Sequence, residues 1–158
     1  MQMANERTPE ETLAALGIPL PQTPAPGGNY VSSKRVGEIV YLSGVISSAG
    51  GAVITGTVGA DRSVEEGYEA AKACALTHLA VLLRELGSLS KVAEVIAVNG
   101  YVNAVPGFAD SPAVINGASD LLVKVFGEAG RHVRAAVGVS ALPRNALVEV
   151  QMTIRISE

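Results

Sequence analysis

The sequence predicts an α+β domain in which a mixed β-sheet packs against two long helices. Two segments carry apolar residues at helical spacing, and the remaining apolar runs are short and rich in valine and isoleucine, as is typical of strands. These segments follow one another as two or three strands, a helix, a strand, a second helix and two final strands. With 158 residues, 48% of them hydrophobic, the chain is long enough for one packed core.

Residues 1–28 are expected to precede this domain as a short helix and an extended arm. The helix is predicted in TPEETLAAL, where Thr8 is a candidate N-cap and Glu11 is its capping-box partner. The following PLPQTPAPGG contains four prolines and two glycines, so it favours an irregular arm. The single domain is then expected to span residues 29–158.

The two long helices are the best-defined elements of the sequence. The first is predicted over residues 63–87, with Ser63 as N-cap and Gly87 at its end, and the second over residues 110–130. Their apolar stripes contain Ala71, Ala75, His78, Leu79, Leu82 and Leu86 in the first helix, and Ala118, Leu121, Leu122, Val125 and Ala129 in the second. Strands are predicted at residues 29–33, 38–44, 51–59, 92–105, 132–139 and 147–156.

The strand at residues 92–105 is apolar on both of its faces. Alternation places Val95 and Ala97 on one face and Ile96 and Val98 on the other. Two helices cover only one face of such a sheet, and no third long helix is predicted. We therefore expect a second copy of the chain to cover the other face in a homo-oligomer.

The last two strands each carry a charged residue, Arg134 or Glu149. Alternation places Glu149 away from the core. In the other strand it places Val133, Ala135, Val137 and Val139 on one face, and it places His132, Arg134, Ala136 and Gly138 on the other face. The two charges are either solvated residues or salt-bridge partners, or they mark a site in which Arg134, between small neighbours, grips a small carboxylate with its planar fork. Periodicity does not choose between these interpretations.

Composition argues against several classes of partner. The net charge of −3 provides no basic field for nucleic acid. Cys74 is the single cysteine and His78 and His132 are the two histidines, so neither a disulfide nor a metal site is expected. The start, MQMANERTPEE, lacks the features of a secretory signal, and no apolar stretch is long enough to cross a bilayer, so we expect a cytoplasmic protein that does not bind membranes.

The cysteine and the two histidines also have ordinary structural explanations. Cys74 is expected to be a buried small side chain and His78 a packed core residue, because both lie on or near the apolar stripe of the first helix. His132 shares the face of Arg134, where a pocket position and a plain surface position are both open.

Several motifs follow one another along the chain: GGNYV, VYLSG, EEGYEAAKACALTHLAVLLRELGSLSKV, V-x-G-Y-V-N, and R-A-A-V-G-V-x-x-L-P followed by V-E-V. With these motifs in this order, the chain over about residues 27–157 resembles the RidA (YjgF-like) family of reactive-intermediate deaminases. NGASDLLVKVFGEAGRHVRAAVGV further resembles a longer-chained branch of the family. The resemblance implies a fold similar to that of Bacillus-type chorismate mutase, in which the last two strands are not paired. It also implies a homotrimer whose sheets form a closed inner barrel.

The resemblance assigns a set of site residues to a pocket between subunits. Arg134 matches the arginine that binds the substrate carboxylate, and Glu149 matches the carboxylate that positions or activates the attacking water. Tyr30 and Ser43 match residues that line the same pocket.

Two positions depart from the family pattern. Ala136 stands where the founding branch has a cysteine, and the expected pocket asparagine falls near Pro106-Gly107. The cysteine contributes mainly its backbone carbonyl, so Ala136 is still expected to border the substrate. The missing asparagine leaves the identity of the substrate open.

The function that the resemblance implies is hydrolysis of reactive enamines and imines, such as 2-aminoacrylate, to 2-keto acids and ammonia. This reaction needs orientation, electrostatic help and a placed proton donor, so no cofactor or metal is expected. Two alternatives stay open. One is a non-catalytic protein that binds a small carboxylate, such as a keto acid, in the same cleft. The other is an endoribonuclease, which the acidic charge balance and the lack of a histidine pair disfavour.

Overall fold

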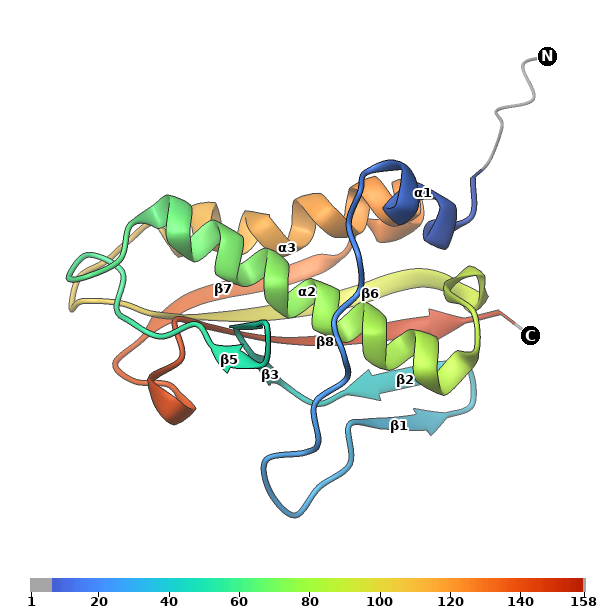
Figure 1. The fold of residues 1–158 in the computed structure, drawn as a ribbon, viewed down its shortest axis with the longest axis horizontal. Helices are drawn as coiled ribbons and strands as arrows, with labels where there is room; N and C mark the ends of the chain where they lie inside the picture. The colour runs from blue at the N-terminus through green and yellow to red at the C-terminus, as the bar shows by residue number, and fades with distance from the viewer. Residues whose placement is uncertain (1–6, 158) are drawn as a thin grey trace.

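The computed structural model describes residues 7–157 as a mixed sheet with two long helices on one face (Figure 1). The helices are α2 (Val64–Leu86) and α3 (Ser111–Phe126), and the short α1 (Pro9–Ala15) packs beside α3. The strands of the sheet are β1 (Ser33–Val36), β2 (Ile39–Leu42), β3 (Val45–Ile46), β6 (Val92–Asn103), β7 (Val133–Val139) and β8 (Val148–Ile156). The smaller elements are the β4–β5 hairpin (Ser48–Ala49 and Ala52–Val53) and the 3-10 turns Leu89–Lys91, Gly127–Gly130 and Pro143–Asn145. This arrangement confirms the predicted α+β class and the predicted packing of two long helices on one face of the sheet.

The strand order is β1-β2-β8-β6-β7, and β3 also pairs with β8. β6 and β7 run parallel, whereas the other pairs of this sheet are antiparallel. Because β6 lies between β7 and β8, the last two strands do not pair, as expected. The short connection between them crosses the end of β6, where the side-chain amide of Asn103 donates to the carbonyl oxygen of Ala146 at 3.1 Å.

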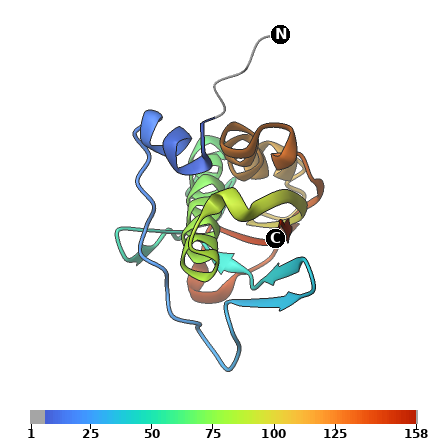
Figure 2. The same cartoon turned by 90° about the vertical axis from the view of Figure 1, so that its right-hand side faces the viewer.

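The predicted helix caps are confirmed. The Ser63 hydroxyl accepts the backbone N–H of Glu66 at 3.0 Å, and the Glu66 carboxylate accepts the backbone N–H of Ser63 at 3.2 Å. Gly87 ends α2 in the left-handed region, with φ of 80°. A second capping box joins Thr8 and Glu11 at the start of α1. From α1 the arm passes across the outer side of α2 toward β1 (Figures 1 and 2), and Arg84 of α2 donates to the Thr23 hydroxyl at 3.0 Å.

Gly117 allows α2 and α3 to pack closely. A Cβ at this position would overlap the backbone carbonyl of Tyr68 on α2, so no larger residue fits without moving a helix. The contact fixes α3 over the sheet, and α3 carries the side chains that hold Arg134.

The core lies between the helices and the sheet. The β8 residues that face the helices are all buried, and they alternate with partly exposed residues that include Glu149, as predicted. His78 is 1% exposed and its Nε2 lies 2.7 Å from the Val150 carbonyl oxygen, which confirms a core histidine. Burial lowers the pKa of His78 to about 4. Cys74 is also buried, and burial raises the pKa of its thiol.

The predicted faces of β6 are wrong at one point. Val95 and Val98, which strict alternation places on opposite faces, are both buried under the helices. The register of β6 against β8 shifts between Val95 and Ala97, and such a bulge adds one residue to the strand without adding one to its partner.

Two strands predicted early in the domain are also wrong. Of the run at residues 29–33, only Ser33 belongs to a strand, where it begins β1. Residues 29–32 are bends and irregular backbone, and the Tyr30 hydroxyl accepts the backbone N–H of Gly27 at 3.0 Å. The run at residues 51–59 forms only the two residues of β5. Gly56 and Gly59 then interrupt it with φ of 129° and 91°, which strands do not adopt.

The second face of the sheet is not covered by any element of residues 7–157. Tyr41, Thr153, Ala97 and Val133 form one row across this open face, from β2 through β8 and β6 to β7. Val133 is 70% exposed and Tyr41 is 51% exposed. None of the helices in the described part of the chain combines the length and the apolar character that a bilayer crossing requires.

Candidate functional site

Arg134 lies on the helix side of β7, and the predicted division of this strand into two faces is confirmed. It is in register with Val98 of β6, which pairs with Met152 of β8, and both of these partners are buried under the helices. Val133 and Val137 point to the open face instead, with exposures of 70% and 46%. β7 is an edge strand of the sheet, and its exposed valines lie on the face that the helices do not cover.

The guanidinium of Arg134 is held by neutral acceptors on α3. Its Nη1 donates to the Asn116 Oδ1 at 2.8 Å and to the Ser119 Oγ at 3.1 Å. Its Nη2 lies 3.4 Å from the carbonyl oxygen of Pro112, at the limit of a hydrogen bond. None of the ion pairs within residues 7–157 includes Arg134. These contacts therefore orient the positive charge without neutralising it.

The contacts of Arg134 leave Nε and one of the two Nη2 hydrogens of its guanidinium available. Both Nη1 hydrogens are donated, whereas Nε has no hydrogen-bond partner among the described residues. Nε and Nη2 form one of the two edges of the guanidinium that bind a carboxylate with two parallel hydrogen bonds. The half-buried Ala136 shares this face two residues further along β7 and presents only a methyl group. The arrangement fits a small organic acid.

Glu149 lies on the opposite face of the sheet. Its neighbours across the strands are Ile46 of β3 and Tyr101 of β6. No ion pair within the described residues includes Glu149, and burial raises the pKa of this carboxyl. The side chain lies against Gly44, where an added Cβ would be 2.9 Å from Oε2. Gly44 therefore makes the space that the carboxylate occupies.

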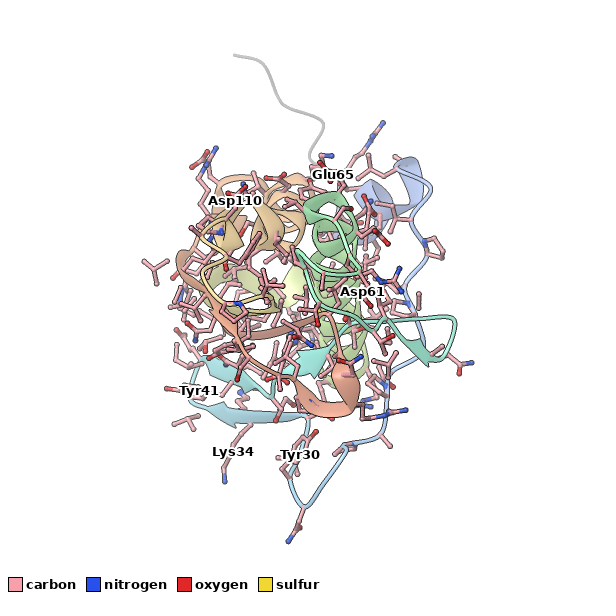
Figure 3. The ribbon with its side chains drawn as sticks, turned by 90° about the vertical axis from the view of Figure 1, so that its left-hand side faces the viewer. Tyr30, Lys34, Tyr41, Asp61, Glu65 and Asp110 are labelled. Atoms are coloured by element: carbon pink, nitrogen blue, oxygen red, sulfur yellow. The ribbon has the colours of Figure 1, made fainter. Side chains whose placement is uncertain are left out.

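Ser43 and Tyr30 lie toward the Glu149 side of the site. Ser43 directly precedes Gly44, and its hydroxyl donates to the carbonyl oxygen of Val31 at 2.6 Å. Tyr30, the residue before Val31, is 50% exposed. In Figure 3, Tyr30 lies at the opposite end of the molecule from Asp110, the residue that begins α3. Tyr30 is therefore far from the first turns of α3, which hold Arg134.

The predicted site residues thus form two separate groups. Arg134 and Ala136 make up the arginine group on the helix side of β7, and Tyr30, Ser43 and Glu149 make up the glutamate group beside β3 and β8. β6 lies between β7 and β8, which separates the two strands by about 10 Å, and the sheet itself lies between the two side chains. A small molecule cannot contact Arg134 and Glu149 of the same chain at once.

Two residues that hold Arg134 were not predicted as site residues. These residues are Asn116 and Ser119, which lie three residues apart on one face of α3. Asn116 also bears on the departure at Pro106-Gly107: an asparagine does lie beside the arginine, but it comes from inside α3 rather than from the preceding loop.

His132 contacts the same serine hydroxyl, that of Ser119, as Arg134 does. Its Nε2 lies 2.8 Å from the Ser119 Oγ, and its Nδ1 lies 2.7 Å from the Gly130 carbonyl oxygen. Burial lowers the pKa of His132, and the positive charge of Arg134 lowers it further. The predicted sharing of a face by His132 and Arg134 is confirmed, because both contact Ser119. Within residues 7–157 no three His, Cys, Asp or Glu side chains are grouped as metal ligands.

Comparison with known proteins gives consistent matches along almost the whole chain. The family model described as "YjgF/chorismate_mutase-like, putative endoribonuclease" matches residues 10–156. The protein TCP17 of Trypanosoma cruzi is 44% identical over 147 residues, which cover 92% of each chain. A 2-iminobutanoate/2-iminopropanoate deaminase of Dermatophagoides farinae is 30% identical over 141 residues, which cover 88% of this chain and 94% of the relative.

A solved structure extends the similarity to three dimensions. The crystal structure of a protein from Shewanella oneidensis, described as a "putative endoribonuclease", superposes with a TM-score of 0.91 at 35% identity. The match covers 95% of this chain and 100% of that one.

Proposed function

We infer that this chain, which belongs to the YjgF/RidA-like family, hydrolyses reactive enamines and imines of small amino acids to 2-keto acids and ammonia. Its fold is the YjgF/chorismate-mutase-like fold, in agreement with the resemblance of the sequence. The relative that is 30% identical is named an imine deaminase, which supports this reaction class. The observation that carries the proposal is the oriented guanidinium of Arg134, which keeps a carboxylate-binding edge unused.

The proposed active site is shared between two subunits of a homotrimer. Arg134 and Ala136 come from one subunit, and Tyr30, Ser43 and Glu149 come from its neighbour. The separation of the arginine and glutamate groups within one chain supports this assembly, since only a second copy can bring them to one small molecule. The exposed Val133 on the open face of the sheet supports it independently, because exposed apolar faces mark association surfaces.

The proposed reaction divides binding and chemistry between the two groups. Arg134 binds the substrate carboxylate with Nε and Nη2 and thereby fixes the neighbouring imine carbon. An enamine first gains a proton at its terminal carbon and becomes the protonated imine. Glu149 then takes a proton from water as the water oxygen bonds to the imine carbon and the C=N electron pair moves to nitrogen.

The second half of the proposed reaction releases ammonia. Protonated Glu149 returns its proton to the amino nitrogen of the carbinolamine. The C–N bond then breaks as the hydroxyl oxygen forms the keto C=O bond, and the hydroxyl proton leaves with the nitrogen as ammonium. The raised pKa of Glu149 suits the first of these proton transfers, because a carboxylate with a higher pKa is a stronger base and takes the proton of the attacking water more readily.

Endoribonuclease activity is the alternative that the family description raises. The geometry disfavours it, because the two histidines are placed apart from each other: His78 is buried behind β8, and His132 lies between β7 and α3. The net charge of −3 also offers no general attraction for a phosphate backbone.

A coupled assay tests the proposal. A pyridoxal-phosphate-dependent threonine dehydratase generates 2-iminobutanoate, and the purified protein is expected to accelerate the appearance of 2-oxobutanoate and ammonia. Arg134→Ala should lower kcat/KM about 100-fold, since it removes a charged hydrogen-bonding partner of the substrate. If Arg134→Ala matches the parent, the proposal is wrong. If the parent binds 2-oxobutanoate but does not accelerate hydrolysis, the chain is a keto-acid binding protein instead.

A further inference from the structure

A chain of hydrogen bonds on the helix side of β7 connects Arg134 to His132 through the Ser119 hydroxyl. The Nη1–Oγ distance is 3.1 Å and the Oγ–Nε2 distance is 2.8 Å. We propose that Ser119 and His132 are positioning residues that hold the Arg134 guanidinium with its Nε–Nη2 edge outward for the substrate carboxylate. The inference rests on the proposed role of Arg134 and extends it to two residues that do not contact the substrate.

The direction of these hydrogen bonds follows from their far end. The Gly130 carbonyl oxygen only accepts, so the Nδ1 of His132, 2.7 Å away, carries the hydrogen and donates it. In the neutral ring Nε2 is then the acceptor, and the Ser119 hydroxyl donates to it. The Ser119 oxygen keeps its lone pairs for the Arg134 Nη1. When His132 is neutral, the Ser119 hydroxyl therefore donates its hydrogen to the histidine, and its oxygen accepts a hydrogen bond from the guanidinium of Arg134.

The anchor of this chain of bonds is rigid. Gly130 is buried, and a Cβ there would overlap the backbone carbonyl of Leu122 on α3, so its own backbone packs tightly against the helix. Ser119 is on α3 as well, and His132 directly precedes β7. Gly130 and Ser119 thus belong to one packed unit with α3, and His132 bridges that unit to the strand that carries Arg134.

The charges around His132 favour its neutral form at pH 7. Arg134 is the cation beside it, through Ser119. The preceding turn contributes Glu128 and Arg131, which pair with each other at 3.0 Å. On α3, Asp120 follows Ser119, but its carboxylate accepts the Tyr68 hydroxyl at 2.7 Å. Burial and the positive charge of Arg134 lower the pKa of His132, and together they outweigh the hydrogen bond to the Gly130 carbonyl oxygen, which raises it.

This coupling has a definite sign. When a carboxylate binds to Arg134, it offsets the positive charge that disfavours protonated His132. The pKa of His132 therefore rises on binding, and by linkage the protein takes up a fraction of a proton when the ligand binds at a pH near the pKa of His132. Replacing Arg134 with glutamine, which removes the charge, has the same effect without any ligand.

Kinetics of three variants separate positioning from a merely structural contact. Ser119→Ala should raise KM for 2-iminobutanoate about tenfold and leave kcat within about twofold, because it removes one hydrogen bond to the charged group that binds the substrate. Ser119→Thr keeps the hydroxyl and should restore KM. Tyr68→Phe is the matched control: it removes another hydrogen bond to α3, of 2.7 Å, and should leave both constants unchanged. A KM for Ser119→Ala equal to that of the parent overturns the proposal.

An NMR titration of His132 tests the coupling without any turnover. Its ring signals are identified by their loss in His132→Gln. The pKa should be higher in Arg134→Gln than in the parent, and higher in the parent with 2-oxobutanoate than without it; identical titrations in all three samples would overturn the inference. Absent imine turnover combined with a shifted pKa would contradict the proposed reaction but support this inference. Turnover that needs Arg134, with an unmoved His132, would do the reverse.

Discussion

Arg134 and Glu149 project from opposite faces of one sheet. Arg134 shares a row with the buried Val98, whereas Glu149 shares a row with Tyr101 and Val137 on the open face. The strands that carry them are separated by β6, so no rotation of the side chains brings the two groups to one small molecule. The family to which the chain belongs includes a named imine deaminase, so the placement of these two residues raises the question of assembly directly.

The first prediction concerns the open face. Val133→Asp should convert the proposed trimer into monomers, because it places a charge in the most exposed apolar position of the described sheet. Light scattering coupled to size-exclusion chromatography measures the change. Leu16→Asp, which alters another exposed apolar residue, at 47%, on the far side of the helices, should leave the mass unchanged. A parent protein that is already monomeric at micromolar concentration would contradict the proposed assembly.

The second prediction concerns the pH dependence of kcat. The proposed reaction needs ionised Glu149, and burial raises the pKa of this carboxyl above its ordinary value of 4.5. The rate should therefore be full at neutral pH and fall as the pH drops through a range that begins above 4.5. Glu149→Gln should lower kcat about 100-fold and abolish this acid limb. An unchanged acid limb in the residual activity of Glu149→Gln would assign the limb to another group.

The third prediction concerns the space beside Glu149. In Gly44→Ala the added methyl group would lie 2.9 Å from the carboxylate oxygen Oε2, so the side chain must move. We expect kcat to fall about tenfold, since a displacement of about 1 Å at a catalytic group lowers the reaction rate. The thermal unfolding midpoint should stay near that of the parent. Activity and midpoint are measured on the same preparation. Full activity would show that the position of the carboxylate is not critical.

The fourth prediction concerns two glycines at the contact between α2 and α3. Gly117→Ala should lower the free energy of unfolding by about 3 kcal/mol, because its Cβ would overlap the backbone of Tyr68. Gly67→Ala should lower the free energy of unfolding far less. Its Cβ would lie 3.0 and 3.2 Å from the two side-chain methyl groups of Val114, which a shift of a few tenths of an ångström relieves, and alanine is favoured over glycine in a helix by about 1 kcal/mol. Urea unfolding of both variants checks the order, and the reverse order would contradict this packing.

The helices and β8 could be predicted from the sequence because local chemistry defines them. Ser63, Glu66 and Gly87 form their caps from neighbouring backbone groups alone, and β8 alternates cleanly between buried and partly exposed residues. The resemblance to the family implied the unpaired last strands, which the short connection alone does not reveal.

The features that the sequence did not reveal depend on distant contacts. The surroundings of Arg134 are decided by the first turns of α3, which lie beside β7, and the bulge near Val95 is decided by the partner strand. Tyr30 does not lie in a strand, because its hydroxyl accepts a hydrogen bond from the backbone N–H of Gly27. Ser119 carried no signal, since a serine on an amphipathic helix is ordinary until the fold places an arginine and a histidine on either side of it.

Mixed subunits test the shared site most directly. Arg134→Ala and Glu149→Gln are each expected to be inactive alone, so the two variants are co-expressed in equal amounts and purified together. If each site takes its arginine from one subunit and its glutamate from the next, about one quarter of the sites in random trimers contain both native residues. The mixture should therefore recover about one quarter of the parent imine hydrolysis. Recovery of no activity from well-mixed trimers would contradict a site built by two chains.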